Sequence, residues 1–199
     1  MNATTAVKIC QRWSWHDYLT WPEGERWELI DGVAFAMAPA PTIAHQSVAG
    51  RLFSRLDQAL KGKPCRPFVA PVDVKLSDHD VVQPDVLVVC NPAKITASHI
   101  AGAPDLVIEV LSPSTAARDL REKKALYAHH GVTEYLVVDP LENYVIRFLL
   151  SAGYGAGDVF AADETVSLES LNGLSLDLRE VFDLPPPASE AERPVVSAH

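Results

Sequence analysis

The sequence predicts an α/β fold, with helices flanking a mixed β-sheet, and three segments support this class. Apolar runs at 106–111 and 134–139 enclose a helical stretch, an order typical of two parallel strands joined by a right-handed crossover. The segment 26–37 has the pattern of an antiparallel hairpin, and apolar residues recur at helical spacing through 43–60. Because parallel and antiparallel pairs are both expected, the predicted sheet is mixed.

The size of the chain favours one such domain. With 199 residues, 48% of them hydrophobic and 22% charged, it has the composition of an ordinary globular protein. We expect an N-terminal extension with a short helix at 1–25, the α/β domain at 26–183, and a disordered, proline-rich tail at 184–199.

The N-terminal half contains clear turn and helix signals. Ser14 is a suitable N-cap for a short helix over 13–19. The dipeptide Asp31-Gly32 is favoured in two-residue type I′ turns, so it predicts the tip of the hairpin. The helix over 43–60 should end at the glycine and proline that follow it.

The C-terminal half is dominated by strand patterns. The run at 106–111 is apolar on both faces apart from Glu109, as expected of a central strand in a covered sheet. A helix should follow, capped within Ser112–Thr115 and ended by Gly131. The other strand predictions are 66–70, 72–76, 81–90 and 144–150, then a glycine-rich hairpin loop, short strands and a final helical turn over 158–182.

The net charge of −9 is unfavourable for a protein that binds nucleic acid, since a phosphate backbone normally needs a basic surface. Two considerations weaken this objection. Carboxylates that hold a metal ion count as negative in the sum, although the ion reverses their local field. The chain also carries a local basic cluster formed by Arg118, Arg121, Lys123 and Lys124.

The sequence also carries signals of cellular location. No segment approaches the roughly 20 apolar residues needed to cross a bilayer, and the first residues lack the pattern of a secretory signal. Cys10, Cys65 and Cys90 are odd in number and far apart, which argues against a disulfide framework and a thiolate zinc site. We therefore expect a cytoplasmic protein without membrane association.

Two carboxylates are candidates for a metal site. Glu109 lies inside a strand that should be buried, where a charge is costly unless it is paired or bound to a metal. Asp85 follows Pro84 at the start of another apolar run, and the separation of the two acids suits neighbouring strands. Such oxygen ligands favour Mg²⁺ or Mn²⁺. Alternatively, Glu109 merely ends a strand and Asp85 caps a turn.

The order Pro84-Asp85 followed by Glu109 resembles the PD-(D/E)XK signature of the restriction-endonuclease-like superfamily. Further stretches resemble its bacterial Uma-type restriction endonuclease family, over roughly residues 12 to 150. These stretches are Trp27–Gly32, Pro39–His45, Val82–Val86, Leu106–Ser114 and Glu122–Tyr135. The Pro-Asp pair alone is common, whereas the ordered series is specific.

The resemblance implies a restriction-endonuclease-like fold and a metal-dependent phosphodiesterase. It implies that Asp85 and Glu109 are metal ligands, with the carbonyl of Val110 as a third. A bound ion would polarise the scissile phosphate and lower the pKa of a water, while a lysine stabilises charge on the phosphoryl oxygens.

That lysine departs from the strict motif, because Leu111 occupies its position. The family pattern implies that Lys123, on the following helix, supplies the charge instead. Asp119 lies four residues before Lys123, on the same helical face, where it can orient the ammonium. The competing interpretation is a solvated surface ion pair. Periodicity alone would also allow Lys124, and the family pattern favours Lys123.

Two further residues are implied by the resemblance or by position. Glu28 would complete an acidic cluster, or would be a solvent-facing strand residue. His45, near the start of a long helix, could contact phosphate or act as an auxiliary base, although a capping or surface role is more common.

The sequence leaves three functional hypotheses. The first is a divalent-metal-dependent endonuclease that hydrolyses phosphodiester bonds in DNA, working as a homodimer by analogy with related nucleases. The second is a catalytically inactive module that keeps the fold for nucleic-acid binding or dimerisation. The third is hydrolysis of a smaller phosphoester. Phosphate-loop, nucleophile-elbow and zinc-protease motifs are absent from the sequence.

Overall fold

The computed structural model describes residues 7–8, 11–22, 24–37 and 40–185. Most of the expected tail, 186–199, therefore lies outside the described residues, and the proposed division of the chain at residues 26 and 184 stays a prediction. The described part folds around two six-stranded sheets and a separate two-stranded one.

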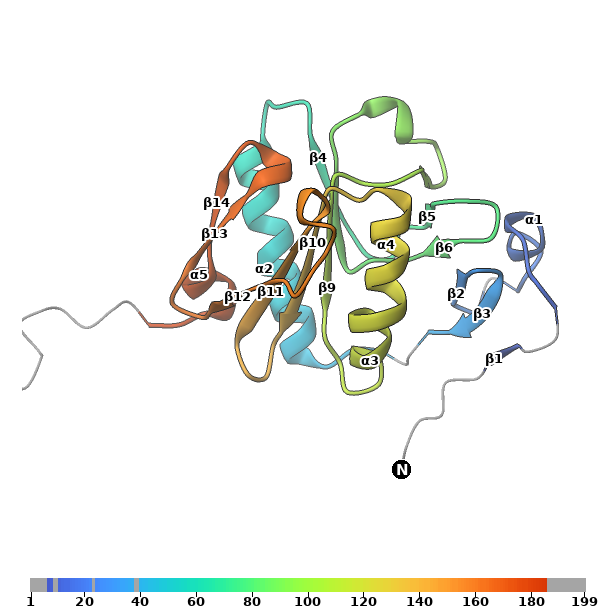
Figure 1. Ribbon diagram of the computed structural model, residues 1–199, viewed down its shortest axis with the longest axis horizontal. Helices are drawn as coiled ribbons and strands as arrows, with labels where there is room; N and C mark the ends of the chain where they lie inside the picture. The colour runs from blue at the N-terminus through green and yellow to red at the C-terminus, as the bar shows by residue number, and fades with distance from the viewer. Residues whose placement is uncertain (1–6, 9–10, 23, 38–39, 186–199) are drawn as a thin grey trace, which may run out of the picture.

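The two six-stranded sheets differ in strand length, and the one with the longer strands, called the larger sheet from here on, carries the strand–helix–strand unit (Figure 1). Only β9 and β10 are parallel, and every other neighbouring pair is antiparallel, so the prediction of a mixed sheet is confirmed. Its order is β12 (Asp158–Ala161), β11 (Tyr144–Leu149), β10 (Glu134–Asp139), β9 (Leu106–Val110), β7 (Val86–Val89) and β4 (Arg66–Val69).

Helices cover both faces of this sheet (Figure 1). The long helix α2 (Ile43–Leu60) packs its apolar stripe, including Leu52 and Leu56, against one face of the sheet. Helix α4 (Lys124–His130) covers the other face with Leu126 and Tyr127. Since side chains alternate along a strand, the buried strands between these helices are apolar on both faces.

The smaller sheet contains the hairpin. Strands β2 (Trp27–Ile30) and β3 (Val33–Ala36) pair antiparallel, and both turn residues, Asp31 and Gly32, have positive φ, as the predicted type I′ turn requires. The remaining strands of this sheet are β1 (Val7–Lys8), β6 (Val81–Val82), β5 (Val74–Lys75) and β8 (Ile100–Ala101). The short helix α1 (Trp15–Tyr18) has Ser14 as its N-cap, as predicted.

The helix after β9 is less regular than predicted. It begins as α3 (Ala116–Arg118), widens into the π-helical turn η2 (Asp119–Lys123) and continues as α4. Thr115 is its N-cap, within the predicted segment, but its side chain accepts no hydrogen bond from the first turn, so the expected side-chain cap does not form. Gly131 ends the helix in the left-handed conformation, as expected. Wide turns of this kind occur frequently at functional sites.

The predicted strand over 81–90 is split between the two sheets. Its first part, β6, pairs with β2 and β5, and its second part, β7, pairs with β4 and β9. The crossing falls at Pro84, which cannot donate to a ladder. As a result, Gln83 and Asp85 lie where the two sheets meet.

The rest of the described chain consists of short elements. The glycine-rich segment after β11 contains η3 (Leu150–Ala152) and leads into β12, so it is the predicted hairpin loop. The final helical turn is α5 (Leu178–Phe182), also as predicted. The elements not yet given are η1 (Pro92–Lys94), β13 (Thr165–Leu168), η4 (Glu169–Leu171) and β14 (Leu174–Asp177).

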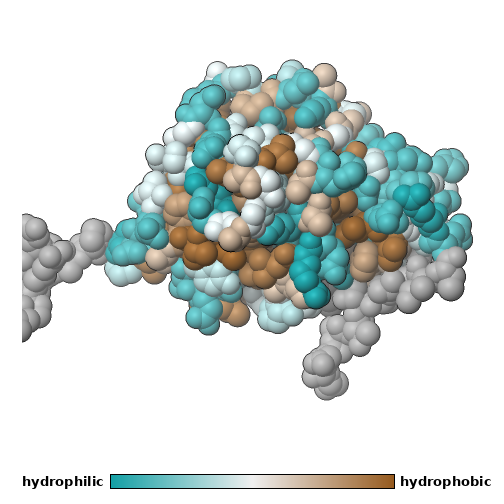
Figure 2. Space-filling model, viewed as in Figure 1, coloured by the Kyte–Doolittle hydropathy of each residue, from teal (hydrophilic) through white to brown (hydrophobic). Residues whose placement is uncertain are grey.

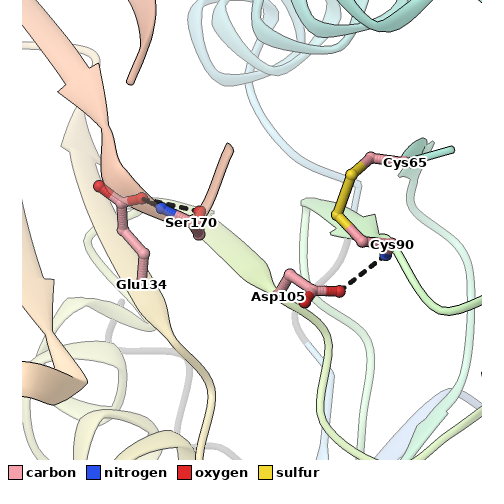
Figure 3. Close-up of a disulfide and its surroundings, with 5 residues drawn as sticks. All are labelled: Cys65, Cys90, Asp105, Glu134 and Ser170. Carbon is pink, nitrogen blue, oxygen red and sulfur yellow. Dashed lines mark hydrogen bonds between the residues drawn. A yellow bond between two sulfur atoms is a disulfide. The ribbon is translucent and has the colours of Figure 1, made fainter. Parts of the chain in front are cut away.

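A disulfide joins Cys65 and Cys90, and the expectation of no disulfide pairing is therefore wrong (Figure 3). The antiparallel register of β4 and β7 pairs Arg66 with Val89, so the residues just beyond this pair face each other. Counting cysteines could not reveal this, because 25 positions separate the two residues in sequence and only strand pairing brings them together.

Among the described residues, no helix combines the length and the apolar character needed to cross a membrane.

Candidate metal and phosphate site

The two predicted acids lie on neighbouring strands. The register of β7 and β9 pairs Val86 with Ile108, which places positions 85 and 109 opposite each other. Asp85 Oδ2 accepts a hydrogen bond of 2.8 Å from the main-chain N–H of Val110. Val110, whose carbonyl is the third expected ligand, therefore contacts Asp85, the first expected ligand.

Lys123 occupies the middle of an acidic cluster. Its Nζ lies 2.8 Å from Glu28 Oε1, 2.9 Å from Glu109 Oε1 and 3.8 Å from Asp119 Oδ1. Only 5% of the lysine is exposed, so this is a buried network and not a solvated surface pair. Lys124 points elsewhere, since its Nζ donates to the carbonyl of Gly155.

Glu28 is buried, contrary to the alternative of a solvent-facing strand residue. It is 2% exposed, and its Oε1 accepts from the main-chain N–H of Gln83 at 3.1 Å. Its second oxygen lies 3.7 Å from the guanidinium of Arg118, which also stacks over Phe35. The smaller sheet therefore contributes an acid to a centre built mainly on the larger one.

The protonation of Glu109 reflects its crowded surroundings. Burial, the largest influence, raises the pKa of Glu109 well above its ordinary value, and Lys123 opposes this effect. Neighbouring carboxylates raise it further, and these are Asp119, Asp85 and Glu28. Tyr127 donates its hydroxyl proton to Glu109 Oε1 at 2.7 Å, so one oxygen of this acid accepts from both the lysine and the tyrosine.

The pKa values of Lys123 and Asp119 are both raised, but for different reasons. Burial would lower the pKa of Lys123, but the surrounding acids, chiefly Glu109 and Glu28, raise it well above its ordinary value. Burial raises the pKa of Asp119 to about 6, despite the opposing charge of Lys123. The ammonium is thus held charged, while the carboxylates compete for too little positive charge.

His45 reaches the site from the first turn of α2. Its Nε2 lies 3.2 Å from Asp85 Oδ2, and the residue is 7% exposed, so it is not a surface residue. Burial lowers the pKa of His45, but the hydrogen bond and charge of Asp85, together with the Val110 main chain, raise it above its ordinary value overall. An imidazole whose pKa is raised by Asp85 thus lies beside the expected metal ligands.

The donor atoms can be compared with the needs of a divalent cation. Within the described ranges, no group of three or more His, Cys, Asp or Glu side chains is arranged to hold a metal ion. The expected set does not require one, because it consists of two carboxylates and one main-chain carbonyl. Asp119 Oδ1 is buried without a hydrogen-bond partner, and the charges of Asp119, Asp85 and Glu28 add to the effect of burial in raising the pKa of Glu109. Donor type and charge therefore fit Mg²⁺ or Mn²⁺.

Sequence reasoning missed three members of this centre: Tyr127, Arg118 and Gln83. Tyr127 follows Lys123 by four residues, a helical spacing that could have indicated its place. Arg118 and Gln83 had no comparable signal, since their contacts depend on how the smaller sheet docks.

Two further polar residues, Asp139 and His130, have structural surroundings. Asp139 accepts hydrogen bonds from the N–H groups of Leu141 and Glu142, as expected of a turn former. His130, at the end of α4, lies 3.0 Å from Asp80 and so has a buried acidic partner.

Comparison with known proteins decides the family. The Uma2 family model, described as "Putative restriction endonuclease", matches residues 15–179. The chain belongs to this family. The resemblance suggested by its motifs is therefore confirmed.

Two individual relatives agree with this assignment. The uncharacterized protein slr1290 of Synechocystis sp. (strain ATCC 27184 / PCC 6803 / Kazusa) is 34% identical over 126 residues, which are 61% of this chain. The match spans 66% of that relative, just under two thirds of its length. A crystal structure from Anabaena variabilis ATCC 29413, titled a "putative nuclease belonging to DUF820", superposes with a TM-score of 0.71 at 22% identity. It covers 86% of this chain and 98% of its own, which confirms the nuclease-like α/β fold.

Proposed function

We propose that this protein is a divalent-metal-dependent endonuclease that hydrolyses phosphodiester bonds in DNA. The observation that carries the proposal is the buried ammonium of Lys123 within hydrogen-bonding distance of Glu28 and Glu109. Asp85, Glu109 and the carbonyl of Val110 would hold Mg²⁺ or Mn²⁺. When bound, the ion would supply Lewis acidity toward the scissile phosphate and lower the pKa of a water.

The protein's own groups have distinct tasks in this proposal. Lys123 supplies positive charge for the phosphoryl oxygens, and the acids around it keep it protonated. Glu28 and Asp119 fix the position of its ammonium. His45, against Asp85, can orient that carboxylate or exchange a proton at the site.

The energetic cost of the cluster argues against an inactive module. Buried charges are expensive, and replacing a buried ion-pair network with apolar residues is often neutral or stabilising. A scaffold kept only for DNA binding or dimerisation would have no physical need for several nearly fully buried acids around one lysine. Catalysis supplies such a need.

The decisive experiment is a cleavage assay with Mn²⁺ or Mg²⁺ on single-stranded, duplex and branched DNA. We expect activity that chelation removes and that Asp85→Ala and Glu109→Ala abolish. Glu134→Gln is a matched control, because it alters another buried strand glutamate away from the cluster. Activity that persists in Glu109→Ala would disprove the site assignment.

Two measurements separate the competing functions. Calorimetric titration with Mn²⁺ should give a binding signal in wild type that both alanine variants lack, whereas an inactive module would give the same trace for all three. A chromogenic phosphodiester that is cleaved while every DNA substrate stays intact would instead favour a smaller substrate.

We further propose a homodimer, and the cytoplasmic location stays a prediction, although the Cys65–Cys90 disulfide removes the cysteine argument for it. The edge strand β12 pairs only with β11 in the larger sheet, and Val159 on it is 67% exposed. Figure 2 shows hydrophobic residues gathered in a band below the centre of this face, in the region of these strands. Light scattering coupled to gel filtration should give twice the monomer mass, and Val159→Lys should halve it while Leu19→Lys, also at an exposed site, does not.

A further inference from the structure

Two cavities adjoin along β4, and the first is lined in part by Gln83, a neighbour of the acidic cluster. The first, of about 330 Å³, lies between the end of β4 and the segment 95–100. The second, of about 580 Å³, lies between the end of α2 and the start of β4. Phe68 and Ile95 line both, so together they form one groove along β4, which is an edge strand of the larger sheet.

The first cavity combines apolar walls with an acceptor. Phe68, Val72 and Ile95 line it together with the carboxylate residue Asp73. Asp73 Oδ1 accepts from Tyr18 and from Gln83, each at 2.8 Å, whereas Oδ2 accepts no hydrogen bond from the residues that the structure describes. Its volume is at the small end of the range of ligand pockets, about 300–1,000 Å³. A flat, partly apolar group with an amino donor suits this cavity.

The second cavity is basic. Lys61, Lys63 and Arg66 line it against one acid, Asp57. The whole chain carries a net charge of −9, so this local excess of positive charge runs against the composition of the protein. Arg66 and Phe68 are two positions apart on β4 and therefore face the same side. One cation and one aromatic ring thus lie at strand spacing on the same side of β4, and the two lysines precede them in the turn after α2.

Gln83 connects this groove to the acidic cluster. Its side chain lines the first cavity and donates to Asp73, while its main-chain N–H donates to Glu28 Oε1. Asp85 lies two residues further on, and its carbonyl accepts from the N–H of Ala70 at the end of β4. The groove therefore runs away from the site at which the scissile phosphate would bind.

We infer that this groove binds single-stranded DNA, a deduction that rests on the proposed function and names its substrate form. Unpaired bases stack on the apolar wall at Phe68, and one of them enters the first cavity with its amino group toward Asp73. Phosphates further along the strand contact Lys61, Lys63 and Arg66. A duplex is excluded from this mode, because its bases are stacked and their hydrogen-bonding edges are paired.

The binding test needs no catalysis. Fluorescence anisotropy of labelled oligonucleotides, in buffer with a chelator, should show tighter binding of a single strand than of the matching duplex. The triple variant Lys61→Ala, Lys63→Ala, Arg66→Ala should weaken this binding at least tenfold. Its plot of log K against log salt should be shallower by about 2, since each phosphate contact contributes about 0.7 for single strands.

A second triple variant controls for net charge. Arg12, Arg51 and Arg55 form ion pairs away from both cavities, so their replacement by alanine removes the same charge. This control should bind like wild type. If both triple variants weaken binding equally, or if duplex binds as tightly as single strand, the groove assignment is wrong. Absence of any DNA binding by wild type also overturns it.

Asp73→Asn tests the cavity itself. Asparagine retains an Oδ1 acceptor for Tyr18 and Gln83 but replaces Oδ2 with a donor, so the fold is preserved. Wild type should prefer oligo-dC, whose bases carry an amino donor, over oligo-dT of equal length by several-fold. The variant should lose or reverse this preference. An unchanged preference would disprove the binding of a base in this cavity.

The two proposals fail in different ways. If wild type cleaves DNA with Mn²⁺ but the groove variants bind and cleave normally, only the groove is disproved. If the single strand binds as described but no metal restores cleavage, the proposed endonuclease activity is disproved and the groove remains.

Discussion

The two ends of the larger sheet each bury a glutamate, and only one of them resembles an active site. Glu109 on β9 and Glu134 on the neighbouring β10 are 3% and 0% exposed. The parallel register pairs Glu109 with Val137 and Glu134 with Leu106, so the two acids lie at opposite ends of their strands.

Neutral groups of Ser170 donate to one oxygen of Glu134, while its Oε1 is buried without a hydrogen-bond partner. Its Oε2 accepts from the N–H and the hydroxyl of Ser170, and burial raises its pKa (Figure 3). At the same end, Asp105 accepts from the N–H of Cys90, beside the disulfide (Figure 3). Contacts here are local and hold strand ends and loops in place.

The surroundings of Glu109 instead crowd charge together. Lys123 lies there within ion-pairing distance of the further acids Glu28 and Asp119, whereas the hydrogen bonds to Glu134 come from neutral groups. The comparison teaches that burial of a carboxylate does not identify a site. Several buried charges that compete for one cation are stronger evidence for a site, because such a cluster costs folding free energy that the fold alone does not require.

The largest effect is expected from Lys123→Met. Removing the ammonium leaves buried acids uncompensated, which should lower the free energy of unfolding by about 3–5 kcal/mol. DNA cleavage should fall by about 10²–10³-fold, the usual loss of one charge-stabilising group. Urea unfolding and cleavage rates measure the two effects. Lys124→Met, which changes the neighbouring lysine, should leave cleavage unaltered, and equal losses in both variants would contradict the comparison.

The next prediction concerns the disulfide, which lies at the opposite end of the larger sheet from the acidic cluster. Replacing Cys65 and Cys90 by alanine removes a constraint on 25 positions of chain, so unfolding free energy should fall by about 3–4 kcal/mol. Cleavage should be retained below the melting temperature, because neither cysteine touches the acidic cluster. Reduced wild type is the matched comparison. A loss of specific activity that accompanies the loss of stability would contradict the prediction that the disulfide and the acidic cluster act independently.

Ser170→Ala is expected to have a smaller effect. It removes one of the two donors to Glu134 Oε2 and should cost about 1–3 kcal/mol, the usual penalty for a buried group left less satisfied. Thermal unfolding and cleavage assays should record lower stability with normal specific activity. A loss of cleavage would mean that the two glutamates are coupled.

Asp80 gives the smallest and most pH-specific effect. Burial would raise the pKa of Asp80, but hydrogen bonds from Ser77, the Asp31 main chain and His130 lower it overall. A lowered folded-state pKa stabilises the protein above the ordinary value of 3.8 and loses that contribution as pH falls through the folded value. Wild type should therefore lose more stability than Asp80→Asn between neutral pH and pH values below about 4. Parallel pH profiles would exclude this carboxylate as the cause.

Much of the fold was predictable because its signals are local. The turn at Asp31-Gly32, the apolar stripe of α2 and the buried pattern of β9 each follow from a few neighbouring residues. The pair Asp85 and Glu109 was also visible, since a carboxylate in an apolar run is conspicuous in sequence. The pattern over 81–90 was misjudged, because one proline divided it between two sheets.

The sequence by itself determined the fold class, the main helices and the identity of the acids that the family resemblance marks. Only the tertiary structure decided that Glu28 is buried, that Lys123 lies between two glutamates, and that Cys65 meets Cys90. These facts depend on how the small sheet docks and on the register of antiparallel strands. Both are set by packing between residues far apart in the chain, about which local patterns carry little information.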